Sequence, residues 1–135
     1  MTKLVQGAAG ACAALLVPFN LRTARLNRLV APAVHGPGAG PRPDFALRVA
    51  RGVISRLARL RVPPYRNTCL FRSVAECLVL RWHGHPAVLR IGVRPDDGPS
   101  GIAAHAWVES AGAPVEAAAA PFEVLRGAPT HTARR

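Results

Sequence analysis

The hydrophobic pattern of this chain changes its period at Gly84, and this change constrains the fold more than any other feature. Before Gly84, the apolar residues of segment 70–82 recur at the spacing of a helix. After it, residues 87–93 and 102–108 alternate between two faces on either side of a turn sequence at 95–99. A helix followed by antiparallel strands predicts an α+β fold.

Helical patterns also precede this unit. Residues 4–17 are rich in Ala and Leu, and Pro18 is expected to end or kink that helix. Residues 21–30 form a second amphipathic pattern with basic flanks. The Pro- and Gly-rich segment 31–43 is predicted to be a linker, because neither a helix nor a central strand tolerates this composition.

A third helix is predicted to begin with Asp44 as its N-cap and to end before the sequence Val62-Pro63-Pro64. The next helix is predicted to be capped by Asn67 or Thr68 and to stop at Gly84.

The length of 135 residues fits one domain. The formal net charge is +11, and 17 of the 18 basic residues are Arg, which is partly a compositional bias. Aromatic residues make up only 5%, which argues against a base-stacking surface, so no nucleic-acid partner is expected. Arg22, Arg25 and Arg28 follow the apolar segment 8–17 at once, which argues against a signal peptide, and no apolar run reaches about 18 residues, so no membrane span is expected. A cytoplasmic location is predicted.

Three cysteines, Cys12, Cys69 and Cys77, are an odd number and do not form a disulfide scaffold. Within one helix, eight residues separate Cys69 from Cys77 by roughly 12 Å, which is too far for a disulfide. Reduced thiols in a cytoplasmic protein are the simplest interpretation. Cys77 is expected in the core, and His83 and His85 lack a second ligand pair for a metal site.

The residues with catalytic potential occur in the order Cys69, His105, Glu116. A cysteine in the first turn of a helix has its thiolate stabilised by free N–H groups and the helix dipole. A histidine on a neighbouring strand can exchange the proton, and a carboxylate can orient the imidazole. A hairpin that pairs Glu109 with Pro114 also pairs Trp107 with Glu116, which puts Glu116 on the face of His105.

Three motifs carry a resemblance to a known family. They are the run Cys69-Leu-Phe-Arg72-Ser73, the strand Leu89-Arg-Ile-Gly-Val93 and the run Ala104-His105-Ala-Trp107-Val-Glu109. Over roughly residues 46–126 the chain resembles the leader peptidases of lasso-peptide biosynthesis, a branch of the transglutaminase-like cysteine-protease superfamily. The resemblance implies a papain-like fold with N-terminal helices, a nucleophile at a helix N-terminus and an antiparallel sheet that carries the histidine.

By this resemblance Cys69 is the nucleophile and His105 its general base and acid, with no cofactor and no metal. Family members carry an Asp after the hairpin, whereas this chain has Glu116, which can replace it with a longer arm; a carbonyl in that role or reduced activity are the alternatives. Arg72 and Trp107 are candidates for substrate binding. The alternative for Arg72 is a contact that stabilises the fold, and the alternative for Trp107 is packing beside His105. The backbone N–H of Cys69 is expected in the oxyanion hole.

The family occurs with a fused or a separate leader-binding domain, and residues 1–45 are too short for the fused one. The resemblance therefore implies a stand-alone protease with three partners: a leader–core precursor peptide, a separate leader-binding protein and an ATP-dependent lactam-forming cyclase. The expected organisation is a helical segment and linker over 1–43, a transglutaminase-like peptidase domain over 44–126 and a frayed tail over 127–135. An acyltransferase with the same thiol chemistry and a non-catalytic basic adaptor that binds precursor or nucleic acid are the alternative functions.

Overall fold

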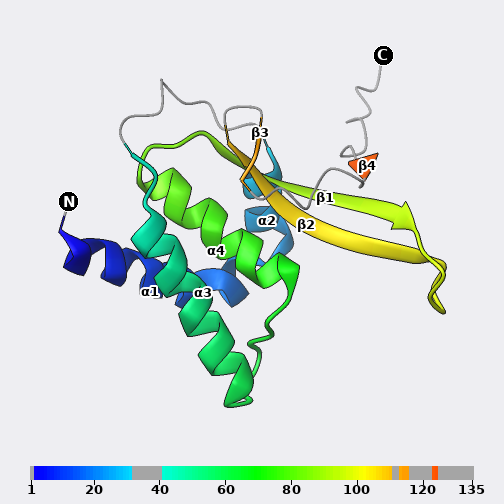
Figure 1. Ribbon diagram of the computed structural model, residues 1–135, viewed down its shortest axis with the longest axis horizontal. Coiled ribbons are helices and arrows are strands. Elements are labelled where there is room, and N and C mark those ends of the chain that lie inside the picture. Colours follow the sequence, from blue (N-terminus) through cyan, green and yellow to red (C-terminus); the bar gives the residue numbers. More distant parts are fainter. Residues whose placement is uncertain (1, 32–40, 111–112, 116–122, 125–135) are drawn as a thin grey trace.

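The structure is a computed structural model and describes residues 2–31, 41–110, 113–115 and 123–124. These residues form helices α1 (Lys3–Asn20), α2 (Thr23–Val30), α3 (Asp44–Arg59) and α4 (Cys69–Trp82), and strands β1 (Ala87–Pro95), β2 (Ile102–Ser110), β3 (Ala113–Pro114) and β4 (Glu123–Val124). The helices gather beside a long β1–β2 hairpin (Figure 1). The predicted α+β class is confirmed.

The sheet is antiparallel and has the strand order β3-β2-β1-β4. Strand β1 pairs with β2 along its whole length, from Ala87 opposite Ser110 to Pro95 opposite Ile102. The predicted pairing of Glu109 with Pro114 is confirmed. The further pairing predicted for Glu116 lies outside the described residues.

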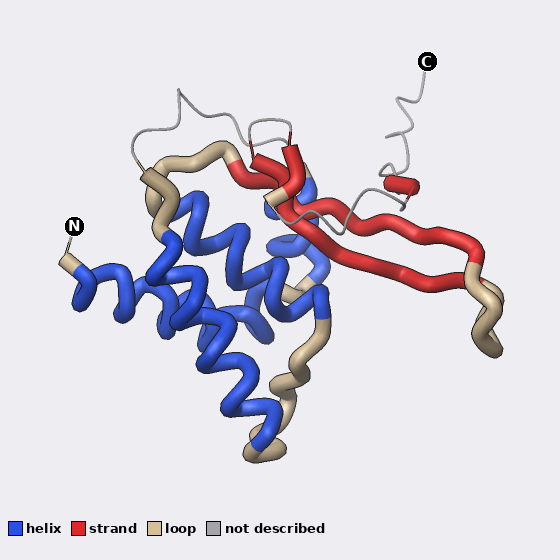
Figure 2. Tube along the Cα trace, viewed as in Figure 1, coloured by secondary structure: helices blue, strands red, loops and turns tan. Residues whose placement is uncertain are grey.

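Helix α4 is the centre of the molecule. It packs against α1 and α3 on one side and against β1 and β2 on the other, so helices and sheet form two layers (Figure 2). Every residue from Ser73 to Leu80 is buried. A helix that is buried almost all round has few polar positions, which explains why its apolar residues are not confined to one face.

Both predicted ends of α4 are confirmed. The side chain of Thr68 accepts a hydrogen bond from the backbone N–H of Phe71 at 3.3 Å, as an N-cap does. Gly84 has a φ of 80°, the left-handed conformation that glycine adopts without steric cost after the end of a helix. Cys69 is therefore fixed as the first residue of the helix.

Two expected helix boundaries differ in the structure. Helix α1 does not end at Pro18 but continues to Asn20; Pro18 has no N–H to donate to Ala14, and the bond from Leu21 N–H to Val17 O is intact at 3.0 Å. Helix α3 has Pro43 as its N-cap, and Asp44 is its first helical residue. The Asp44 carboxylate makes no cap and instead faces Arg42 at 3.6 Å.

Side chains far apart in sequence hold the helices together. The hydroxyl of Tyr65 donates to the carbonyl of Leu15 at 2.9 Å, and its ring meets the edge of Phe71. These contacts fix the segment that leads from α3 into α4.

Arg81, near the end of α4, donates to backbone carbonyls of Ala87 at 2.8 Å, Arg28 at 2.9 Å, Leu29 at 3.1 Å and Ala31 at 3.3 Å. A single guanidinium thus closes the carbonyl end of α2 and joins it to β1.

Candidate functional site

The candidate nucleophile, Cys69, lies half-buried in the first turn of α4. Thr68 satisfies the N–H of Phe71 through its side chain and the N–H of Arg72 through its carbonyl. The N–H groups of Cys69 and Leu70 have no acceptor within the helix, as at any helix start. These two donors point in the direction that stabilises negative charge near the thiol.

The candidate acid and base, His105, lies half-buried on β2. Its ring stacks on Trp107, with centroids 6.0 Å apart and planes 17° from parallel. The indole N–H of Trp107 donates to Glu109 at 3.3 Å, and Glu109 also pairs with Arg90 at 3.1 Å. Glu109 is therefore the salt-bridge partner of Arg90 and an acceptor for the indole N–H of Trp107.

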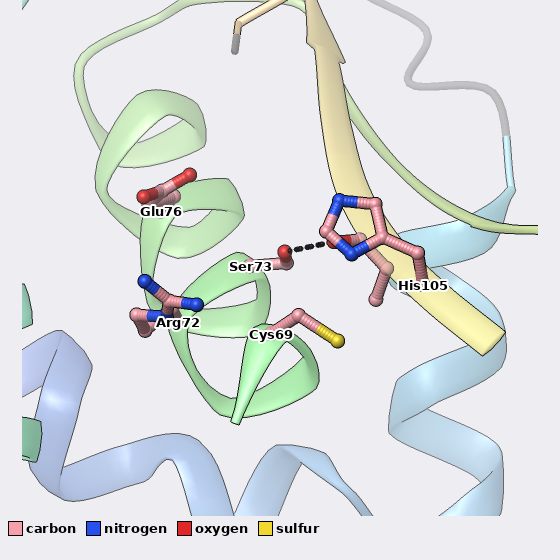
Figure 3. Close-up of a pocket in the computed structure, with 6 residues that line it drawn as sticks. Cys69, Arg72, Ser73, Glu76 and His105 are labelled. Carbon is pink, nitrogen blue, oxygen red and sulfur yellow. Dashed lines mark hydrogen bonds between the residues drawn. The ribbon is translucent and has the colours of Figure 1, made fainter. Parts of the chain in front are cut away.

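Cys69 and His105 line the same small pocket, together with Arg72, Ser73, Glu76 and Ala106. Its volume is about 10 Å³, which is the space of one water molecule. Figure 3 shows the Cys69 side chain pointing from the start of α4 towards the strand that carries His105. The fold therefore joins the two groups that the sequence placed 36 residues apart.

Ser73 connects the two elements that carry these groups. Its hydroxyl is buried and donates to the carbonyl of Ala106 at 2.9 Å (Figure 3). Ser73 lies one helical turn after Cys69, and Ala106 is the residue next to His105 on β2. This hydrogen bond therefore sets the position of the imidazole strand relative to the thiol helix.

A buried carboxylate, that of Glu76, also lines the pocket. Glu76 is only 3% exposed and is paired with the guanidinium of Arg51 on α3, whose Nη2 lies 2.5 Å from Oε1. A carboxylate at such depth needs a cation or several donors to remain ionised. The pair ties α3 to α4 under the pocket.

The sequence motifs assign no role to Ser73, which lies in the run 69–73, or to Glu76. Their positions, four and seven residues after Cys69, place all three on one face of the helix, and this spacing was the signal available. What the spacing does not show is the identity of their partners, which come from α3 and β2.

The other predicted site residues are placed differently. Arg72 is exposed and lines the pocket, and in Figure 3 it extends from the other side of α4 than Cys69. Trp107 is 4% exposed, does not line the pocket and packs against His105. Glu116 lies outside the described residues.

The two remaining thiols have different surroundings. Cys77 is fully buried, as expected of a core residue, and burial raises its pKa to about 11. Cys12 is exposed on α1. In the described part of the chain, no three His, Cys, Asp or Glu side chains come together in a way that could hold a metal ion.

The arrangement of thiol, imidazole and helix-start N–H groups is able to perform acyl transfer through a thioester. A sequence profile of the transglutaminase-like superfamily matches residues 13–126. Searches of curated proteins and of solved structures give no significant match.

Proposed function

The chain belongs to the transglutaminase-like superfamily, and from this premise we propose that it is a cysteine peptidase that removes the leader from a ribosomally synthesised lasso-peptide precursor. The observation that carries the proposal is the pocket shared by Cys69, in the first turn of α4, and His105 on β2. The choice of a lasso precursor rests on the resemblance of the three motifs around residues 69–73, 89–93 and 104–109 to leader peptidases.

In this reaction the thiolate of Cys69 attacks the carbonyl carbon of the peptide bond between leader and core. The oxyanion that forms accepts hydrogen bonds from the N–H groups at the start of α4. His105 then protonates the leaving amine, the C–N bond breaks, and the core is released with a free N-terminus. The leader remains on Cys69 as a thioester.

Water completes the cycle. His105 takes a proton from a water molecule, which attacks the thioester carbonyl and releases the leader acid and the thiol. The pocket beside the two groups has the volume of one such molecule. An acyltransferase differs only in this second step, where an amine replaces water.

We assign the third catalytic role, orientation of the imidazole, to Glu116. The register that supports this assignment, with Glu109 opposite Pro114, is observed up to the last described residues of the hairpin. Glu116→Gln should lower turnover and leave precursor affinity unchanged, because the carboxylate acts as the imidazolium forms. Glu109→Gln is the matched control, since Glu109 is occupied by Arg90 and Trp107.

If Glu109→Gln is inactive while Glu116→Gln is neutral, the third role belongs to Glu109. If both variants are neutral, the enzyme is a dyad of Cys69 and His105.

The proposal is tested by incubating the protein with a leader–core precursor, with and without a separate leader-binding protein, and by measuring product masses. A free leader acid and a core amine support a peptidase. A leader joined to an added amine identifies an acyltransferase instead. Cleavage that persists in a folded Cys69→Ala protein would rule out thiol catalysis and favour the adaptor function.

The resemblance also implies that the precursor is presented by the separate leader-binding protein and that the released core passes to the lactam-forming cyclase. We propose the arginine-rich segment 22–61 as the docking face for the leader-binding protein, with nine Arg and Asp44 as its one acid. Cleavage should therefore be slow without that protein and should weaken with added salt.

A further inference from the structure

The buried and exposed faces of helix α1 differ in the size of their side chains rather than in polarity. Its buried face consists mainly of small residues, among them Gly10, Ala13, Ala14 and Val17. Apart from Lys3, every exposed residue of the helix is apolar, and we call these residues the α1 stripe: Leu4, Val5, Ala8, Cys12, Leu15, Leu16 and Phe19. Surface helices of globular proteins ordinarily show the opposite arrangement.

The small inner face is required by the packing. A Cβ on Gly10 would lie 2.3 Å from the backbone carbonyl oxygen of Ala46, so α1 and α3 approach each other at backbone distance. Larger side chains cannot enter this contact and are directed outwards. The rotation of α1 about its own axis is therefore fixed, and the stripe cannot turn into the core.

The stripe is long and well exposed. Leu15 is 55% exposed, Val5 49%, and Leu16 and Phe19 40% each. From Leu4 to Phe19 it extends about 22 Å at 1.5 Å per residue. A continuous apolar surface of this kind marks an interaction site in a soluble domain.

Cations stand at both ends of the stripe. Lys3 lies at one end, and Arg22 and Arg25 lie at the other, with their guanidinium carbons 5.5 and 3.8 Å from the centroid of the Phe19 ring. The first acidic residue of the chain is Asp44, so α1 and α2 contain no acid. The surface therefore combines an apolar centre with purely positive ends.

The apolar centre and the positive ends of the stripe together indicate which kind of partner binds it. A second copy of the chain would bring like charges together in either orientation, at a net charge of +11 for each chain. A folded protein partner needs hydrogen-bonding groups, about one per 100–200 Å² of interface, and the stripe has no side chain that supplies them apart from a thiol. A bilayer with anionic lipids needs only an apolar face and flanking cations.

We propose that the α1 stripe is a membrane-docking face that lies flat in the interface of a bilayer containing anionic lipids. The apolar side chains enter the boundary of the acyl chains, and Lys3, Arg22 and Arg25 meet the lipid headgroups. None of the described helices is long and apolar enough to cross a membrane, so the contact is with one surface. This inference does not depend on the proposed peptidase activity.

The test is flotation of the full chain with vesicles made of equal amounts of phosphatidylglycerol and phosphatidylcholine, compared with vesicles of phosphatidylcholine alone. The wild type should float with the anionic vesicles and lose binding as salt is added. The double variant Leu15→Ser/Phe19→Ser should lower the partition coefficient by roughly one to two orders of magnitude. Leu60→Ser is the matched control, because Leu60 is 72% exposed at the end of α3, away from the stripe, and should leave binding unchanged.

The thiol of Cys12 provides a second readout, since it lies exposed within the stripe. In a Cys69→Ala background, anionic vesicles should protect Cys12 from a water-soluble maleimide, and vesicles of phosphatidylcholine alone should protect it less.

Two results would overturn the proposal. The first is that no vesicle binds the wild type; a dimer in sedimentation that Leu15→Ser/Phe19→Ser dissociates would then assign the stripe to self-association. The second is binding that is equal in the wild type and in Leu15→Ser/Phe19→Ser with Cys12 still reactive, which would mean that net charge alone attracts the protein.

Discussion

The start and the middle of α4 carry the same functional group, a thiol, in opposite environments. At the first turn, the thiol of Cys69 faces a pocket and an imidazole. Two turns later, the thiol of Cys77 is buried, and its Sγ lies 3.7 Å from the carbonyl oxygen of Ala87. The surroundings of the second thiol raise its pKa to about 11. The comparison teaches that position along one helix, rather than residue type, decides which cysteine is available for chemistry.

The largest expected difference between the two thiols is in catalysis. Cys69→Ala should reduce leader cleavage by about 1,000-fold or more, because it removes the proposed nucleophile. Cys77→Ala should retain wild-type turnover and lose about 1 kcal/mol of unfolding free energy through a small cavity. Mass spectrometry of the products and urea denaturation measure the two quantities. Equal losses of turnover in the two variants would contradict the comparison.

Thiol labelling sharpens the comparison without using activity. With a pKa of about 11, Cys77 at pH 8 should react with a maleimide at least about 100-fold more slowly than a free cysteine, from ionisation alone. Its labelling should increase about tenfold per pH unit until the pH approaches 11. Peptide mapping after labelling checks this, and the chain unfolded in guanidinium, where all three cysteines react, is the control.

The same pKa shift predicts a loss of stability in base. The unfolded chain ionises the Cys77 thiol near pH 9, whereas the folded chain keeps it protonated to about pH 11. The unfolding free energy should therefore fall as the pH rises through this range. Cys77→Ala should remove that part of the pH dependence.

We expect the C-terminal end of α4, where Arg81 lies, to contribute strongly to the free energy of unfolding. Arg81→Met removes the guanidinium that donates to the carbonyls of α2 and of Ala87, and we expect a loss of about 2–3 kcal/mol in unfolding free energy. Arg90→Met, which breaks one partly exposed ion pair with Glu109, should cost about 0.5–1 kcal/mol. Denaturant titration of both variants gives the comparison, and an Arg81→Met protein as stable as the wild type would refute the role of this residue.

A smaller loss of turnover than that of Cys69→Ala is expected at Ser73, which lies between the two thiols. Ser73→Ala removes the hydrogen bond to Ala106 and should lower kcat about tenfold with KM unchanged, because the imidazole strand loses its fixed distance from Cys69. Ser73→Thr keeps the hydroxyl and should recover most of the rate. A change in KM alone, or no recovery by the threonine, would mean that Ser73 has only a packing role.

Local patterns predicted the elements that carry the site. A cap at Asn67 or Thr68, the stop at Gly84 and the pairing of Glu109 with Pro114 all follow from short stretches of sequence, and the structure shows the cap at Thr68, the stop and the pairing. Of the two outcomes expected at Pro18, the end of α1 is not observed: the helix continues to Asn20, because its packing against α3 and α4 outweighs the local penalty for proline.

Long-range partners could not be predicted in the same way. Glu76 is tolerated in the core through Arg51 of α3, and Ser73 acts through a carbonyl of β2. The sequence around Glu76 does not show which arginine pairs with it. The sequence around Ser73 does not show its acceptor either, since any backbone carbonyl can accept from a serine. The catalytic assignments of Cys69, His105 and Glu116 stay predictions until turnover is measured.

The long-range hydrogen bonds of Arg81 also have a consequence for folding during synthesis. Its acceptors Arg28 and Leu29 lie 53 and 52 residues earlier in the chain, and α2 thus leaves the ribosome well before the guanidinium that closes its end. At about 5–20 residues per second, this gap lasts roughly 3–10 s. During that time α1 and α2, which are apolar and cationic, lack their partners in α4. A nascent chain of this protein therefore exposes the apolar faces of both helices before its core can form.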